Sequence, residues 1–131
     1  MRISERRVGE VAVVDLAGKL TCTDGPGLVK DKVTSLVHQG HKNIVLNLAD
    51  ITYVDSSGLG ELVACHLTAE RGGATIKLAN AGYRIQDLLV LTKLLTIFES
   101  HQSETTAVDS FARTRMRFGG EFPPALWSRA F

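Results

Sequence analysis

The sequence predicts one α/β domain with a mixed, mostly parallel sheet, an N-terminal hairpin and about four helices. Strand-like and helix-like apolar patterns alternate along most of the chain, which favours parallel strands joined by right-handed crossovers. Residues 44–46 are apolar without interruption, as in a strand that helices cover on both faces. A chain of 131 residues, 44% of them hydrophobic and 22% charged, is long enough to bury one core without metal or disulfide support.

The first half of the chain predicts a hairpin, a helix and a central strand. Residues 11–16 are rich in β-branched side chains and follow the turn signal at Gly9, so together with residues 3–8 they predict an antiparallel pair. A helix is then expected between Pro26, which suits a first turn, and Gly40, which suits a C-terminal stop. Its apolar stripe comprises Val29, Val33, Leu36 and Val37. Residues 44–46 predict the central strand, and 49–54 are expected to form a loop.

The second half continues the alternation. A second helix is expected to end at Gly72-Gly73, with an apolar stripe that comprises Leu59, Leu62, Val63 and either His66 or Leu67. Residues 76–78 predict a half-buried strand, 85–92 a third helix, and 96–98 a short strand. An amphipathic helix over 104–111 is expected to close over the sheet.

The composition shifts after residue 112, where paired glycines and paired prolines interrupt any regular element. We therefore assign residues 1–112 to the domain and 113–131 to a C-terminal tail that is expected to be flexible. Arginines alternate with aromatic residues in this tail, which leaves open a docking peptide for a partner or an RNA contact.

Charge and cysteine content argue against several classes of function. Fifteen basic and fourteen acidic residues give a net charge of +1, so no bulk attraction to nucleic acid or to anionic lipid is expected. The two cysteines, Cys22 and Cys65, lack CxxC spacing and follow no leader peptide, as is typical of reduced thiols in the cytoplasm. No apolar run approaches the roughly 20 residues that span a bilayer. We expect a cytoplasmic protein that binds neither membrane nor nucleic acid directly.

The patterns typical of cofactor, metal and catalytic sites are incomplete. Gly58-Leu59-Gly60 begins a dinucleotide-binding GxGxxG spelling, but its third position is Val63. The histidines show no metal-ligand spacing with the cysteines. Val54 stands where a serine hydrolase would have the first glycine of GxSxG. We therefore expect no cofactor, no metal and no enzymatic activity.

The strongest candidate site is the segment Asp55-Ser56-Ser57-Gly58, between the central strand and the second helix. Such residues cap a helix, which contributes about 1 kcal/mol. Gly58 and Gly60, however, each weaken a helix by about 1 kcal/mol relative to alanine, which a purely structural cap does not require. They are expected to leave the backbone open to close approach. Functional sites of open α/β sheets also gather beyond the carboxyl ends of strands, so we predict a contact surface here.

This segment lies within a longer resemblance to a known family. Ile44-Val45-Leu46-Asn47-Leu48, Asp50, Tyr53-Val54 and the run from Asp55 to Gly60 resemble the signature of the STAS domain of bacterial anti-sigma factor antagonists. The resemblance extends from about the first strand through Phe111 and implies a STAS-like fold. It also implies partner switching in a stress response. An anti-sigma factor serine kinase binds such antagonists and phosphorylates the serine directly after the aspartate, here Ser56. A PP2C-type phosphatase restores the free form, which releases the sigma factor for transcription.

The sequence departs from the family pattern at residues 21–24, because members often carry an aspartate directly after Gly-x-Leu. Asp24 is expected to substitute for it. Helical spacing predicts an exposed, partner-facing surface that comprises Asp24, Asp55, Ser57, Gly58, Glu61, Cys65 and Thr68.

Two rival classes of function remain open. The first is a STAS scaffold or small-ligand-binding signalling module that is not phosphorylated, which a pocket near Asp55 would indicate. The second is a response-regulator receiver, which needs carboxylates clustered for magnesium. Asp15, Asp50 and Asp55 do not follow that strand-end pattern.

Overall fold

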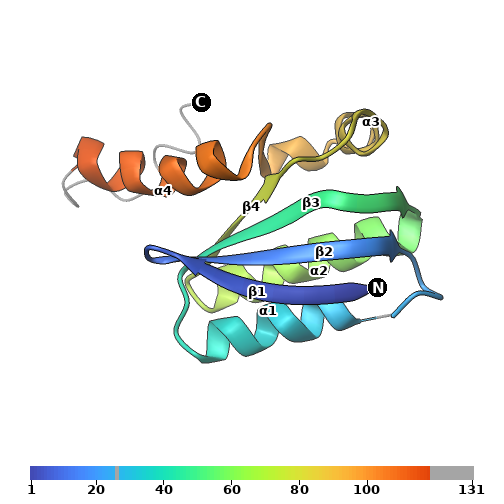
Figure 1. Cartoon of the computed structure of the whole chain (residues 1–131), viewed down its shortest axis with the longest axis horizontal. Helices are drawn as coiled ribbons and strands as arrows, with labels where there is room; N and C mark the ends of the chain where they lie inside the picture. Colours follow the sequence, from blue (N-terminus) through green and yellow to red (C-terminus); the bar gives the residue numbers. More distant parts are fainter. Residues whose placement is uncertain (26, 119–131) are drawn as a thin grey trace.

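A mixed five-stranded sheet with helices on both faces forms the centre of the molecule (Figure 1). The computed structural model describes residues 1–25 and 27–118. Its strands, in the order in which they lie side by side, are β1 (Arg2–Val8), β2 (Val11–Leu20), β3 (Asn43–Val54), β4 (Thr75–Ala79) and β5 (Glu99–His101). β1 and β2 are antiparallel, and every other neighbouring pair is parallel. The predicted fold class is confirmed.

The helices and strands alternate as predicted. The helical elements are α1 (Leu28–His38), α2 (Ser56–Arg71), α3 (Tyr83–Leu91), the short 3-10 helix η1 (Leu94–Thr96) and α4 (Glu104–Phe118). Pro26, predicted in the first turn of α1, lies outside the described residues. None of the helices in the described part of the chain is both long enough and apolar enough to cross a bilayer.

Two apolar layers hold the helices on the sheet. Side chains of β2 point alternately to the two faces, so Val14 lies in the same cluster as Leu62 of α2, whereas Val13 lies in a second cluster with Ala107 of α4. Figure 1 shows α1 and α2 on one face and α4 on the other. The prediction that the last helix closes over the sheet is confirmed.

The predicted loop over residues 49–54 is wrong, because β3 continues through Val54. Its second half lies beyond the end of β4 and pairs with β2, up to the partners Leu20 and Val54. Irregularities in this pairing bring Leu48, Ile51 and Val54 into the core at intervals of three residues instead of two. The alternation that identifies a strand in a sequence is therefore hidden.

Lys77 of β4 is buried, whereas a half-buried strand was expected. Its Nζ donates a hydrogen bond to Ser110 Oγ of α4 over 2.6 Å, lies 3.2 Å from a carboxylate oxygen of Glu99, and sits 4.3 Å from the centre of the Phe111 ring. Ser110 and Phe111 of α4, together with Glu99 of β5, thus provide polar and aromatic partners for the buried ammonium group. The neighbouring strand β5 begins at Glu99, three residues later than predicted, because residues 94–96 form η1.

The start of α4 is tied to the N-terminal hairpin by Arg6. Arg6 donates two hydrogen bonds to the Asp15 carboxylate, over 2.6 and 2.9 Å, and also donates to Glu104 in the first turn of α4. The predicted boundary between residues 112 and 113 falls inside α4, which continues to Phe118. The rest of the predicted tail, residues 119–131, lies outside the described residues.

Candidate functional site

Asp55 joins the end of β3 to the start of α2. Its backbone is extended, and its Oδ1 accepts a hydrogen bond of 2.9 Å from the Gly58 N–H. Its own N–H donates to the Leu20 carbonyl at the end of β2. The capping interpretation of this segment is therefore correct. The cap also places Ser56 and Ser57 as the first two residues of α2, where both are exposed.

The two glycines of this first turn have different surroundings. A Cβ at Gly58 would lie 2.0 Å from the Leu20 carbonyl oxygen, so only glycine lets α2 pack this closely against the end of β2. A Cβ at Gly60 would have no neighbour within 4 Å. The expectation that the glycines leave the backbone open to a partner therefore fits Gly60, whereas the close neighbour of Gly58 belongs to the protein itself.

The predicted exposed face of α2 is wrong for Gly58 and Cys65, which are both buried. The predicted core positions Leu59 and Leu62 are confirmed, because the buried residues of α2 are Gly58, Leu59, Leu62, Cys65 and Ala69. Leu67 is 45% exposed, and His66 packs its ring edge against buried Phe98 with the ring centres 5.5 Å apart. Exposed residues of α2 therefore include Ser56, Gly60 and Leu67, which helical geometry places on one outward ridge.

Glu61 is not the solvated charge that the sequence suggests. Its Oε2 accepts hydrogen bonds from the Val29 and Lys30 N–H groups, over 2.9 and 3.2 Å, and its Oε1 accepts from the Gly27 N–H over 3.2 Å. The start of α1 has no side-chain cap of its own, so this residue of α2 supplies one. Thr68, predicted on the same surface, is half-buried two turns further along α2.

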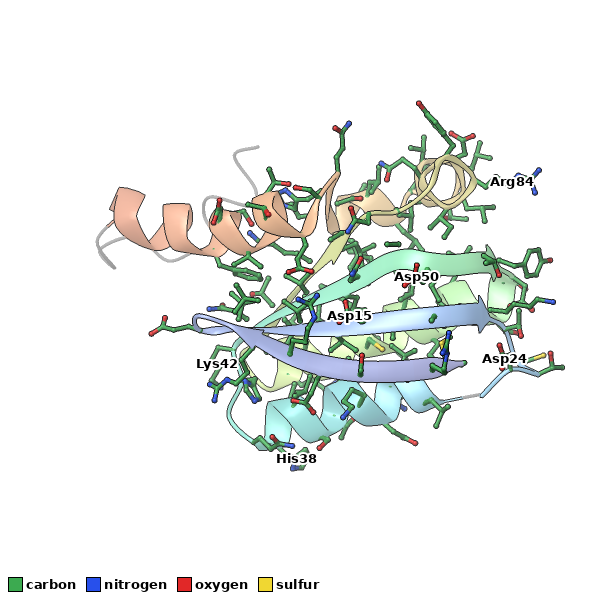
Figure 2. The ribbon with its side chains drawn as sticks, in the orientation of Figure 1. Asp15, Asp24, His38, Lys42, Asp50 and Arg84 are labelled. Atoms are coloured by element: carbon green, nitrogen blue, oxygen red, sulfur yellow. The ribbon has the colours of Figure 1, made fainter. Side chains whose placement is uncertain are left out.

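Asp24 lies on the loop that follows Leu20, at the end of the molecule where β2 ends (Figure 2). Its Oδ2 accepts a hydrogen bond from the Lys19 N–H over 3.1 Å, and its Oδ1 lies 2.6 Å from the amino group of Met1. These two contacts, the amino group first, lower the pKa of Asp24. The side chain remains half-exposed.

The two cysteines differ in accessibility. Cys22 is exposed on the same loop as Asp24, whereas Cys65 is buried on the core-facing side of α2. Burial, and secondly the charge of Glu61, raise the pKa of the Cys65 thiol to about 12. Cys65 is therefore a core side chain with an unreactive thiol.

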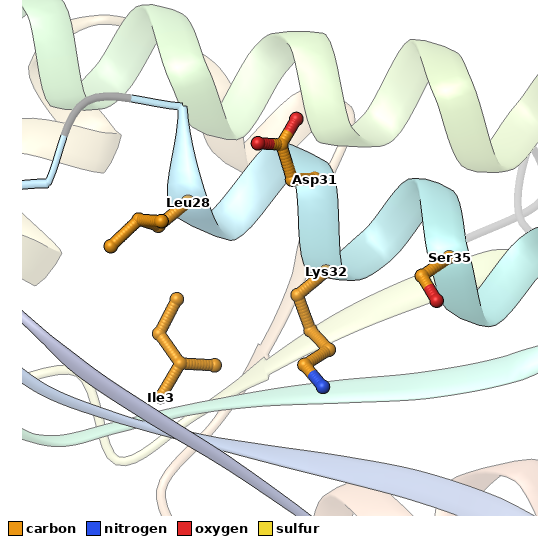
Figure 3. A pocket seen from close by; sticks show the side chains of 5 residues that line it. All are labelled: Ile3, Leu28, Asp31, Lys32 and Ser35. Atoms are coloured by element: carbon orange, nitrogen blue, oxygen red, sulfur yellow. The ribbon is translucent and has the colours of Figure 1, made fainter.

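The described residues form a shallow hollow of about 440 Å³ between β1 and α1, lined by Ile3, Leu28, Asp31, Lys32 and Ser35 (Figure 3). None of the predicted site residues lines it, and it is not the pocket near Asp55 that a small-ligand module requires. In the parts of the chain that the structure describes, no group of three or more His, Cys, Asp or Glu side chains is placed to hold a metal ion.

Comparison with known proteins identifies related chains. The model of the STAS domain family matches residues 2–107. The anti-sigma-B factor antagonist of Bacillus subtilis (strain 168) is 30% identical over 86 residues, which cover 66% of this chain and 77% of that protein.

Solved structures show the same fold. The crystal structure of a putative anti-sigma factor antagonist from Thermotoga maritima has a TM-score of 0.71 at 20% identity, covering 82% of this chain and 92% of that one. The phosphorylated form of the Bacillus cell fate determinant SpoIIAA has a TM-score of 0.65 at 20% identity, covering 84% and 99%. The STAS domain of a SulP transporter from Vibrio cholerae has a TM-score of 0.66 at 16% identity, covering 86% and 88%.

Proposed function

This chain belongs to the STAS domain family, and we propose that it acts as an anti-sigma factor antagonist that phosphorylation of Ser56 switches off. In its free form it binds an anti-sigma factor serine kinase in the cytoplasm and thereby frees a sigma factor for transcription. A PP2C-type phosphatase returns it to that form. The protein acts by binding and catalyses no reaction itself.

The observation that carries this proposal is the placement of Ser56. Its side chain is exposed at the first position of α2, directly after the Asp55 cap, so a kinase reaches its hydroxyl without unfolding any element. Transfer forms a bond between Ser56 Oγ and the γ-phosphorus of ATP and breaks the bond from that phosphorus to the bridging oxygen. ADP leaves, and the hydroxyl proton passes to the kinase.

The partner surface follows the outward ridge of α2. Ser56, Gly60 and Leu67 are exposed there, with Ser57 exposed beside them, and the absence of a side chain at Gly60 allows another protein to approach the backbone. Asp55 caps the start of this ridge, and we include Asp24, on the loop after β2, in the same surface. Glu61 lies at its border with α1, half-buried Thr68 follows two turns further along α2, and Gly58 and Cys65 are buried on the core side of the helix.

The switch is electrostatic. A phosphate on Ser56 adds about −1.5 to −2 charges at an exposed helix start, where free amide groups and the helix dipole favour an anion. The fold of this protein therefore tolerates the phosphate. If a partner packs an acidic or apolar surface against the same helix start, repulsion and desolvation weaken its binding by roughly several kcal/mol.

Incubation with candidate anti-sigma factor serine kinases and ATP, followed by mass spectrometry of the digested protein, tests the proposal. We expect one phosphate on the peptide that contains Ser56, and none after the change Ser56→Ala. The matched variant Ser57→Ala is expected to keep its phosphate. If every kinase that binds the protein leaves Ser56 unmodified, the phosphorylation switch is wrong.

A further inference from the structure

The carboxylate of Glu61 is fixed in place. Three backbone N–H groups at the start of α1, those of Gly27, Val29 and Lys30, donate to its two oxygens over 2.9 to 3.2 Å. Both oxygens are therefore occupied, and the side chain cannot rotate away without leaving these amides unpaired. A negative charge thus has a permanent position between α1 and α2, next to the candidate phosphorylation segment.

Helix geometry places the side chain of Glu61 on the same face of α2 as Ser57 and on a different face from Ser56. Ser57 and Glu61 are four residues apart on α2, a spacing that brings side chains onto the same face, about 5–6 Å apart at their Cβ atoms. Helical side chains also lean toward the N-terminus, so Glu61 leans toward Ser57. Ser56 and Glu61 are five residues apart and are separated by about 140° around the helix axis. The two neighbouring serines therefore differ in their electrostatic surroundings, although both are exposed.

We propose that Glu61 determines which of the two adjacent serines carries the phosphate. The inference rests on the proposed phosphorylation of this segment and deepens it. A phosphate on Ser57 would face the fixed carboxylate of Glu61, and the α1 amides that would otherwise attract it are already occupied. A phosphate on Ser56 faces solvent and the first amides of α2. Glu61 thereby directs phosphoryl transfer from ATP to Ser56 Oγ.

A first test needs no kinase. Thermal unfolding is compared for Ser56→Asp and Ser57→Asp, each alone and combined with Glu61→Gln, which removes the charge and keeps an acceptor oxygen. Both aspartates gain the same attraction at the helix start, so Ser56→Asp is the matched control. We expect Ser57→Asp to melt about 1–3 °C below Ser56→Asp, and this gap to close with Glu61→Gln. If the difference in melting temperature between Ser56→Asp and Ser57→Asp is the same with Glu61 and with Glu61→Gln, the inference is overturned.

A second test maps the phosphate. The kinase and ATP are added to the unmodified protein, to Glu61→Gln and to Glu70→Gln, which removes a carboxylate that is 70% exposed further along α2. We expect the ratio of phosphate on Ser57 to phosphate on Ser56 to rise about two-fold to five-fold for Glu61→Gln alone. An unchanged ratio contradicts the inference while the proposed function stands. A protein that no kinase modifies contradicts the proposed function, and the melting comparison then decides the role of Glu61.

Discussion

Single residues at the start of α2 combine structural and functional requirements. Gly58 is needed because the Leu20 carbonyl oxygen occupies the space of a side chain, whereas no contact among the described residues requires a glycine at Gly60. The exposed Gly60 therefore reduces the stability of the helix, and its open surroundings fit a surface that a partner approaches closely. The two glycines look equivalent in the sequence. Their different roles become visible only in the structure, where the end of β2 lies beside α2.

Alanine substitutions separate these two roles. Gly58→Ala is expected to lower the free energy of unfolding by about 1–3 kcal/mol, because α2 must move away from β2. Gly60→Ala is expected to raise it by about 0.5–1 kcal/mol and to weaken binding of the kinase. Urea unfolding and a binding titration of both variants measure these effects. A Gly60→Ala protein that binds the partner as tightly as the unmodified protein would exclude close approach at this position.

The thiols give a pH-dependent prediction. The pKa of Cys65 is raised to about 12 in the folded protein, so the folded state keeps this proton at a pH where the unfolded chain has lost it. The stability that this proton contributes is complete below a pH of about 9 and is lost as the pH rises toward 12. We expect the loss of unfolding free energy over that range to be smaller in Cys65→Ala. If the free energy of unfolding falls equally steeply with rising alkaline pH in the two proteins, the thiol of Cys65 does not have a raised pKa.

Labelling at pH 8 checks the same difference in accessibility. We expect a thiol reagent to modify exposed Cys22 in the folded protein, and to modify Cys65 only after unfolding. Cys22→Ala provides the control, because the folded variant should then take up no label. Rapid labelling of that variant would mean that Cys65 is accessible.

At the scale of elements, most of the fold follows from apolar periodicity, and the errors have physical causes. The β-branched run of residues 11–16 and the stripe of α1 are visible in the sequence, whereas the division of Val13 and Val14 between two cores appears only in the structure. The predicted stripe of α2 is right for Leu59 and Leu62, which are buried, and wrong for Leu67, which is exposed, whereas Gly58 and Cys65 were wrongly placed on the surface. A regular spacing through Gly58, Leu62, Cys65 and Ala69 was present but involves small residues. Glu61 caps α1 only because α1 and α2 pack side by side. This contact joins residues that are far apart in the sequence, so no local sequence pattern could predict it.

Arg6 supplies a prediction for the attachment of α4. Arg6→Met keeps an apolar stem of similar length but removes the hydrogen bonds to Asp15 and Glu104. We expect amide hydrogen exchange to accelerate in the first turns of α4, while α1 and α2 keep their protection. Unchanged amide exchange in α4 would show that its apolar contacts alone hold the helix on the sheet.

Acid unfolding offers a second measurement of the same contact. The hydrogen bonds from Arg6 lower the pKa of Asp15, so this carboxylate stabilises the fold above its unfolded pKa of about 3.9 and ceases to do so as the pH falls through its folded value. Arg6→Met should therefore lose less stability between neutral and acid pH than the unmodified protein. If the free energy of unfolding depends on acid pH identically in the two proteins, Arg6 is not the cause of the lowered pKa of Asp15.

For the molecule as a whole, the proposed switch requires no change of fold. Ser56 is exposed at one end of a sheet whose core is packed on both faces, so an added charge there disturbs no buried contact. The sequence alone indicated this segment, and the family resemblance selected Ser56 over Ser57. The role that we propose for Glu61, whose carboxylate is held by α1, would give a physical reason for that choice.

The affinity of the anti-sigma factor serine kinase for the free and the Ser56-phosphorylated protein, measured by calorimetric titration, tests this account most directly. We expect tight binding of the free protein and an affinity at least about 100-fold lower after phosphorylation, which corresponds to roughly 3 kcal/mol. Far-UV circular dichroism of the two forms should coincide. Equal affinities for the two forms would contradict the account.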